Sequence, residues 1–154
     1  AFADGPTIRQ LVDGATYLFT NEYEAHLTEQ KTGWDADEIS NRVTTRVITK
    51  GKDGVSITSR EADPIEVGVV PGESPADPTG VGDAFRAGFL TGLASGLGHE
   101  RCAQLGSLLA AYVLETVGTQ EYQLDRSRFL LRLAHAYGHP SAEEIEPHLG
   151  PLTP

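Results

Sequence analysis

Residues 77–85, AspProThrGlyValGlyAspAlaPhe, place a carboxylate and two glycines directly before a predicted helix. The glycines at positions 80 and 82 let the backbone turn tightly and leave its N–H groups open to an anion. The first turn of the helix adds about half an elementary positive charge. A carboxylate, Asp83, beside such a turn suits transfer of a phosphoryl group to a hydroxyl, with Asp83 as the base. A tight strand-to-helix turn without chemistry is the alternative.

Known phosphate-binding patterns do not account for this segment. A Walker A loop needs GlyLys followed by Ser or Thr, which the segment lacks. The dinucleotide fingerprint needs a third glycine where this chain has Phe85. The acid that directly follows the second glycine therefore distinguishes the segment from both.

Two further polar segments follow predicted strands. AsnGluTyrGlu at 21–24 follows a predicted strand over 17–20, and ThrLysGlyLysAspGly at 49–54 begins where a predicted strand over 46–49 ends. Ligands of α/β sheets bind beyond the carboxyl ends of the strands, so we expect these segments and 77–83 to meet at one rim. From the residues alone, Asn21 is a helix N-cap, Glu24 a surface acid and 49–54 a hairpin turn. Lys50 and Lys52 in that turn either steer phosphate or are solvated.

The elements that must position these segments alternate between strands and helices. Further strands are predicted over 55–58 and 65–70, and a loop with three prolines over 71–79. This order predicts an α/β layered fold with a partly parallel sheet. Helices are predicted over 22–30, 83–96, 99–117 and 125–137. Shorter helices are predicted to begin at Asp4, at Asp35 and at Ser141, where Glu38 and Glu144 have capping-box spacing to Asp35 and Ser141. Leu11, Leu90 and Cys102 are expected on buried helix faces.

Composition limits the classes of partner. The chain has 154 residues with 12 Lys and Arg against 22 Asp and Glu, a net charge of −10, which disfavours nucleic acid but not a nucleotide substrate. No apolar run approaches the roughly 20 residues that span a bilayer, and we expect no signal peptide at the start of the chain. A single cysteine excludes an internal disulfide and fits the reducing cytoplasm.

His135 and His139 have metal-ligand spacing, but Gly138 and Pro140 favour a helix C-terminus there.

Residues 77–85 resemble the second signature of the ribokinase-type carbohydrate and nucleoside kinases, also called the phosphofructokinase-B family. The usual pattern is Asp-Thr-x-Gly-Ala-Gly-Asp-x-Phe; here Pro78 and Thr79 depart from the Thr-x order and Val81 replaces alanine. The resemblance implies a ribokinase-like, Rossmann-type layered sheet with flanking helices. It also implies that Asp83 is the catalytic base and that the amides of Gly80, Val81 and Gly82 form the anion hole.

The same resemblance extends to the other polar segments. Residues 21–24 match an Asn-x-x-Glu motif, which implies that Asn21 and Glu24 organise Mg²⁺ and phosphate, Glu24 through water. Residues 49–54 match a Thr-x-Gly-x-x-Gly loop, which implies contacts of Thr49 and Gly51 with ATP and a turn opened by Gly54. Other positions have weaker counterparts in the family. Ser107 would lie beside the adenine, with helix packing as the alternative for the small residues Gly106, Ser107, Ala110 and Ala111. Asp77, Thr79 and Gly118 would surround a monovalent cation, for which K⁺ is the candidate.

The resemblance runs from residue 17 to residue 121 and is strongest to bacterial adenosine kinases. It implies ATP-dependent phosphorylation of a primary hydroxyl, that of adenosine to give AMP. A ribose- or fructose-type sugar kinase and an inert nucleotide-binding fragment are the alternatives. Family members begin with a half that carries a Gly-Gly motif, acceptor contacts and a lid, so residues 1–154 are expected to be the C-terminal ATP-binding portion of one kinase domain. AlaPheAlaAsp is then the tail of a buried strand in a partial, methionine-free chain, whose exposed sheet edge favours a homodimer.

Overall fold

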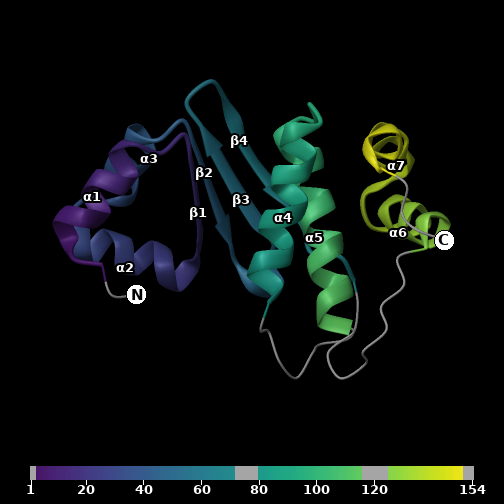
Figure 1. The fold of residues 1–154 in the computed structure, drawn as a ribbon, viewed down its shortest axis with the longest axis horizontal. Coiled ribbons are helices and arrows are strands. Elements are labelled where there is room, and N and C mark those ends of the chain that lie inside the picture. The colour runs from purple at the N-terminus through teal and green to yellow at the C-terminus, as the bar shows by residue number, and fades with distance from the viewer. Residues whose placement is uncertain (1–2, 72–79, 116–124, 151–154) are drawn as a thin grey trace. The chain divides into compact units, whose positions relative to one another are not determined.

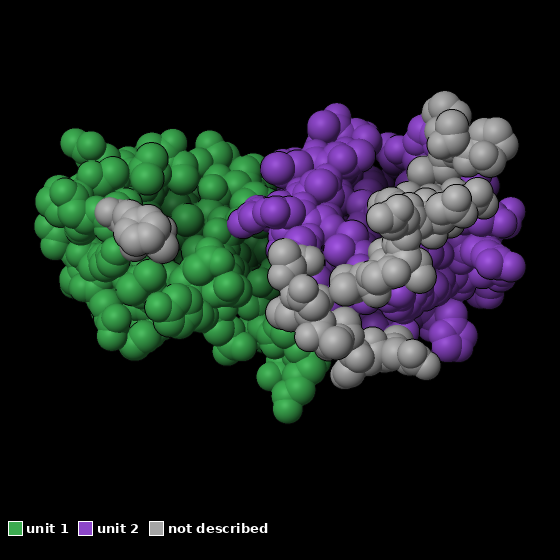
Figure 2. All heavy atoms as spheres, turned by 60° about the horizontal axis from the view of Figure 1, so that its bottom comes forward, with its two compact units in different colours: residues 1–68 green, residues 69–154 purple. Residues whose placement is uncertain are grey.

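The computed structural model describes residues 3–71, 80–115 and 125–150. The chain divides into two compact units, residues 1–68 and residues 69–154, which are coloured separately in Figure 2. Unit 1 contains a sheet with helices, whereas the described part of unit 2 is helical (Figure 1). Within the described residues, no helix has both the length and the apolar character needed to cross a bilayer.

The sheet of unit 1 has four strands, β1 (Tyr17–Asn21), β2 (Thr45–Thr49), β3 (Val55–Ser59) and β4 (Ala62–Val67), in that spatial order. β1 and β2 are parallel, and the other two pairings are antiparallel. The predicted partly parallel α/β sheet is therefore confirmed. β4 lies earlier than the predicted strand over 65–70, because the short turn after β3 pairs Ser59 with Ala62 and so fixes its start. β4 tolerates Pro64 because it has one neighbouring strand among the described residues.

Three helices accompany this sheet, and each begins where a polar side chain accepts a backbone hydrogen bond. α1 (Gly5–Asp13) is capped by Asp4, α2 (Glu22–Thr32) by Asn21 and α3 (Ala36–Arg42) by Asp35. Each cap satisfies one of the amides that a helix start leaves without an intrahelical partner. The predicted helix entries at Asp4 and Asp35 are confirmed. Val12, Ile39 and Val43 are buried together between these elements.

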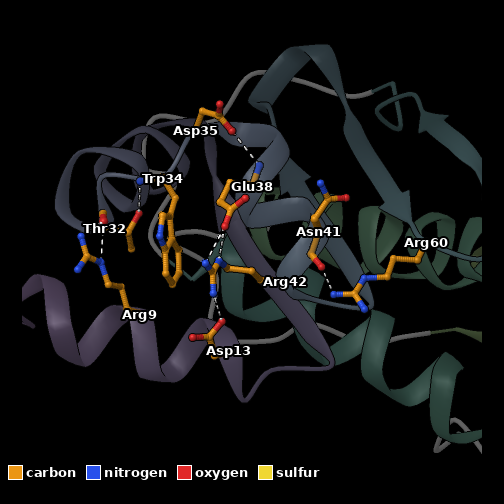
Figure 3. A network of polar contacts seen from close by, with 9 residues as sticks. All are labelled: Arg9, Asp13, Thr32, Trp34, Asp35, Glu38, Asn41, Arg42 and Arg60. Atoms are coloured by element: carbon orange, nitrogen blue, oxygen red, sulfur yellow. Dashed lines mark hydrogen bonds and ion pairs between the residues drawn. The ribbon is translucent and has the colours of Figure 1, made fainter.

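A polar cluster around Trp34 holds the three helices together (Figure 3). The guanidinium carbon of Arg42 lies 3.7 Å from the centroid of the Trp34 ring, and that of Arg9 lies 5.6 Å from it. Arg9 Nε donates to the carbonyl oxygen of Thr32 at 2.7 Å, and Arg42 Nη1 donates to Asp13 Oδ1 at 2.8 Å. Contacts of an arginine with an aromatic face each contribute about 0.5–1 kcal/mol when exposed. The cluster therefore fixes the ends of α1, α2 and α3 relative to one another.

Unit 2 contains α4 (Val81–Ala94), α5 (His99–Glu115), α6 (Arg126–Tyr137) and α7 (His139–Ile145). α4 and α5 lie side by side (Figure 1) and touch through glycines. A Cβ placed on Gly106 would lie 2.6 Å from the carbonyl oxygen of Phe85, and one on Gly88 would lie 2.7 Å from the Cα of Gly106. The two backbones are thus in direct contact, so the helix-packing reading of the small residues on α5 is confirmed for Gly106.

Three predictions for the helices are wrong in detail. Leu11 and Leu90 were expected to face the core but are 65% and 48% exposed, because each lies one helical step, about 100°, from the buried neighbours Val12 and Phe89. Ser141 was expected to cap the last helix, yet α7 begins at His139. The Ser141 hydroxyl instead donates to Gln104 Oε1 at 2.6 Å inside the packed interface with α5. Cys102 is fully buried, as predicted.

Candidate active site

The start of α4 carries the predicted anion-binding turn. Gly80 precedes the helix with φ of 84°, a left-handed conformation that favours glycine. The first intrahelical hydrogen bond runs from the Ala84 N–H to the Gly80 carbonyl at 3.0 Å. The amides of Val81, Gly82 and Asp83 therefore precede the hydrogen-bonded ladder of the helix. Among the described residues, no side chain caps this helix, and nothing outside the helix itself lies within 4 Å of a Cβ placed on Gly82.

Asp83 lies in the first turn of α4 and points away from the packed interior. Its side chain is 80% exposed, and Oδ1 accepts a hydrogen bond from the guanidinium of Arg86, one turn along the helix. An exposed pair of this kind contributes little free energy, so a ligand can displace Arg86 at small cost. The carboxylate is therefore accessible beside three amides that face out of the helix start.

In unit 1 the parallel pairing of β1 with β2 brings two predicted site residues together. Asn21 and Thr49 are Cα partners at the carboxyl ends of the two strands. Asn21 Oδ1 accepts the Glu24 N–H at 2.7 Å, so the predicted N-cap is confirmed and the side-chain NH₂ remains as a donor. Glu24 is exposed in the first turn of α2. This edge of the sheet thus presents an amide donor, a hydroxyl and a carboxylate.

The 49–54 loop leaves β2 and returns as β3. Its residues Gly51–Asp53 form a 3₁₀ turn, and the Lys50 N–H donates to the Gly54 carbonyl at 2.8 Å to close the neck of the loop. Gly54 has φ of 85°, and a Cβ there would lie 2.1 Å from the carbonyl oxygen of Val67 on β4. The loop therefore requires glycine at this position for two independent reasons, conformation and close approach. The predicted hairpin turn is confirmed.

The side chain of Lys50 is 25% exposed and forms an ion pair, which neither predicted role, phosphate steering or solvation, included. Its Nζ lies 2.8 Å from Glu66 Oε2 on β4, and Ser56 Oγ on β3 donates to Glu66 Oε1 at 2.6 Å. The hydrogen bond from Lys50, followed by that from Ser56, holds the pKa of Glu66 below its usual value. Lys52, by contrast, is exposed. Glu66 was not among the predicted site residues.

The remaining predicted residues are more scattered. Ser107 lies half-buried on α5 and forms a hydrogen bond with Tyr137 on α6. Burial raises the pKa of Tyr137, and the hydrogen bond with Ser107 opposes that rise. His135 lies in the last turn of α6, as predicted. Among the residues that the structure describes, no three His, Cys, Asp or Glu side chains gather into a potential metal site. Asp77, Thr79 and Gly118, predicted around a monovalent cation, lie outside the described residues.

Comparisons with known proteins agree on one family. The family model for pfkB family carbohydrate kinases matches residues 3–126. A nucleoside kinase of Methanocaldococcus jannaschii is 31% identical over 111 residues, which are 72% of this chain and 36% of that protein. Adenosine kinase 1 of Arabidopsis thaliana is 31% identical over 117 residues, 66% of this chain and 34% of that protein.

Solved structures agree with the predicted ribokinase-like fold. A nucleoside kinase of Burkholderia thailandensis, solved in complex with inosine, superposes with a TM-score of 0.81 at 39% identity, covering 88% of this chain and 45% of that one. The same kinase has been solved in complex with ADP-inosine. The chain spans less than half the length of the curated relatives and structures that it matches here.

Proposed function

Because the chain belongs to the pfkB family of carbohydrate kinases, we propose that it serves an ATP-dependent kinase that phosphorylates the 5′-hydroxyl of a nucleoside. Adenosine is the first substrate to test, since an adenosine kinase is among the relatives and the related Burkholderia thailandensis kinase was solved with inosine. In this proposal residues 1–154 provide the ATP side of the site and the base. The acceptor contacts come from elsewhere in the kinase.

The observation that carries the proposal is the accessible carboxylate at the start of α4. Asp83 is exposed, and it lies beside the amides of Val81 and Gly82, which precede the helical ladder. Phosphoryl transfer depends on holding the γ-phosphate and stabilising its charge while a carboxylate orients the attacking hydroxyl. The amides and the positive end of the α4 dipole hold the phosphate oxygens. Asp83 takes the proton of the hydroxyl, a role that contributes about 10²–10⁴ in rate.

Mg²⁺ and ATP are the cofactors of this proposal. Mg²⁺ keeps several waters and takes one or two carboxylates together with substrate phosphates, which fits the exposed Glu24. Asn21 Oδ1 accepts the Glu24 N–H, and the side-chain NH₂ remains as the donor that we propose for phosphate or metal-bound water. Thr49, Gly51 and Ser107 are the further nucleotide contacts we propose. When bound, the metal would neutralise charge on the phosphates.

The test is Asp83→Asn in the complete kinase, with phosphorylation followed as ADP release and ATP binding followed by calorimetry. The variant keeps the size of the side chain but cannot accept a proton, so turnover should fall by about 10²–10⁴. ATP affinity should change by less than about threefold, because the amides remain. Asp37→Asn removes another exposed acid from the first turn of a helix, α3, and should leave turnover unchanged.

Three outcomes would contradict the proposal. Unchanged turnover in Asp83→Asn would remove Asp83 from the catalytic role. A panel of nucleosides and sugars assayed with the complete, unsubstituted kinase decides the acceptor, and a preference for ribose or fructose would replace the nucleoside with a sugar. Nucleotide binding without turnover on any acceptor would instead favour a nucleotide-binding module.

A further inference from the structure

We propose that Glu66 is a positioning residue that clasps Lys50 and thereby holds the 49–54 loop in its nucleotide-binding shape. The proposal rests on the proposed function, in which this loop contacts ATP. It assigns Lys50 to the scaffold of the loop and not to the phosphates. It also gives a role to β4, which carries no residue of the predicted motifs.

In the clasp, each of the two oxygens of the Glu66 carboxylate accepts one hydrogen bond. Ser56 and Glu66 are Cα partners on β3 and β4, and Ser56 Oγ donates to Glu66 Oε1 at 2.6 Å. This bond orients the carboxylate, so that Oε2 receives Lys50 Nζ at 2.8 Å. The lysine side chain is 25% exposed, whereas that of Glu66 is 63% exposed. Lys50 is thus laid along the sheet surface toward β4.

The loop is held at two neighbouring points of the same strand. The backbone of Gly54 approaches Val67 so closely that a Cβ would lie 2.1 Å from the Val67 carbonyl oxygen. Glu66, the residue before Val67, holds the side chain of Lys50 from the opposite end of the loop. The tip between these points, residues 51–53, is exposed and has no strand pairing. Anchoring both ends reduces the conformational freedom that the loop would lose when a nucleotide binds.

A phosphate-steering role for Lys50 predicts the opposite response to loss of Glu66. If Lys50 acted through its charge, removal of the neighbouring carboxylate would free the ammonium group and strengthen nucleotide binding. If Lys50 acts as a clasp, the same removal loosens the loop and weakens binding. Glu66→Gln therefore separates the two roles by the sign of its effect, since glutamine keeps the size of the side chain.

The experiment measures the Kd for MgADP by calorimetry, together with KM for ATP and KM for the nucleoside, in the complete kinase. Glu66→Gln should raise the Kd for MgADP and KM for ATP by about two- to fivefold, the range that an exposed charge pair gives. KM for the nucleoside should stay within about 1.5-fold, because the loop lies on the ATP side in the proposed function. Lys50→Glu and Glu66→Lys should each weaken MgADP binding similarly or more, since like charges then face each other.

The charge exchange Lys50→Glu with Glu66→Lys should restore the Kd to within about twofold of the starting value. Its matched control is Lys52→Glu with Glu66→Lys, which carries the same charges in the same loop and strand but places no opposite charges at positions 50 and 66. The Kd of this control should not return toward the starting value. Circular dichroism verifies that each variant is folded. Tighter binding in Glu66→Gln, or no rescue by the exchange in a folded variant, would overturn the clasp while Asp83→Asn still reports on the base. Absence of MgADP binding in the unsubstituted chain would overturn the clasp and the proposed function together.

Discussion

Substitution of Gly106 by alanine tests the contact between α4 and α5, on which the position of Asp83 depends. Gly106 has no room for a Cβ, because the methyl carbon would lie 2.6 Å from the carbonyl oxygen of Phe85 and 3.0 Å from its ring. A side chain can rotate away from such a contact, but a carbonyl oxygen within a helix cannot. The two helices must therefore separate by several tenths of an ångström. Because α4 carries Asp83 two residues before Phe85, the shift also moves the candidate base.

Two opposing terms determine the magnitude. Overpacking of an interior costs typically 1–3 kcal/mol, and replacement of glycine by alanine inside a helix returns about 1 kcal/mol. With a backbone atom as the obstacle, the upper part of the overpacking range applies, so we expect a net loss of about 1–2 kcal/mol in the free energy of unfolding. For a chain of this size that corresponds to a decrease in Tm of about 2–8 °C.

Thermal and urea unfolding followed by circular dichroism measure the loss, with Gly82→Ala as the control. Gly82 also lies in α4, but nothing among the described residues outside its own helix lies within 4 Å of a Cβ placed there, so this variant should gain up to about 1 kcal/mol. If Gly106→Ala were as stable as the unsubstituted chain, the helices could not be in backbone contact. The assignment of the small residues on α5 to helix packing would then be wrong.

Two further predictions concern unit 1. Asn21→Ala removes the cap of α2 and should lower the free energy of unfolding by about 0.5–2 kcal/mol, whereas Asn21→Asp, which keeps an acceptor for the Glu24 N–H, should retain most of it. The second concerns Glu66, whose pKa is depressed in the fold below its ordinary 4.5 by Lys50 and Ser56. Its contribution is therefore present above pH 4.5 and lost as the pH falls through the lower value of the folded chain. Glu66→Gln should be less stable than the unsubstituted chain at pH 7, and urea unfolding should show the difference shrinking toward pH 3; a constant difference would contradict the charge pair.

Local signals in the sequence predicted most helix starts because capping involves residues only three positions apart. Asp4, Asn21 and Asp35 each accept the N–H that this spacing predicts. Ser141 has the same spacing to Glu144, yet its hydroxyl bonds Gln104, which is 37 residues away. A buried partner on another helix therefore outweighed the local preference, and nothing near Ser141 in the sequence indicates that partner.

The contacts of the candidate site likewise fall into those that the sequence pattern predicts and those that depend on the strand register. The approach of Asn21 to Thr49 follows from two strands being parallel, a property that the alternation of strands and helices predicts. The partner of Lys50 depends instead on the register of two hairpins. Glu66 reaches Lys50 because Ser56 pairs with Glu66 and Ile48 pairs with Ser56. A shift by one residue would turn Glu66 to the other face of the sheet, and composition alone does not fix that register.

The pairing of charges bears on the proposed function, in which a chain with a net charge of −10 binds a polyphosphate. Arg86 at the start of α4 forms an ion pair with Asp83, and Lys50 in the 49–54 loop forms one with Glu66. The carboxylates therefore offset the charges of these two side chains. The donors that remain at these two places include, beside the exposed Lys52, backbone amides, which need no counterion and stay fixed by the helix and the loop neck. Attraction by side-chain charge alone would fall off steeply with salt, whereas oriented amides act at contact distance. In the proposed function the phosphate contacts are therefore backbone amides held in place by the fold, and the positive φ of Gly80 at the start of α4 is part of that geometry.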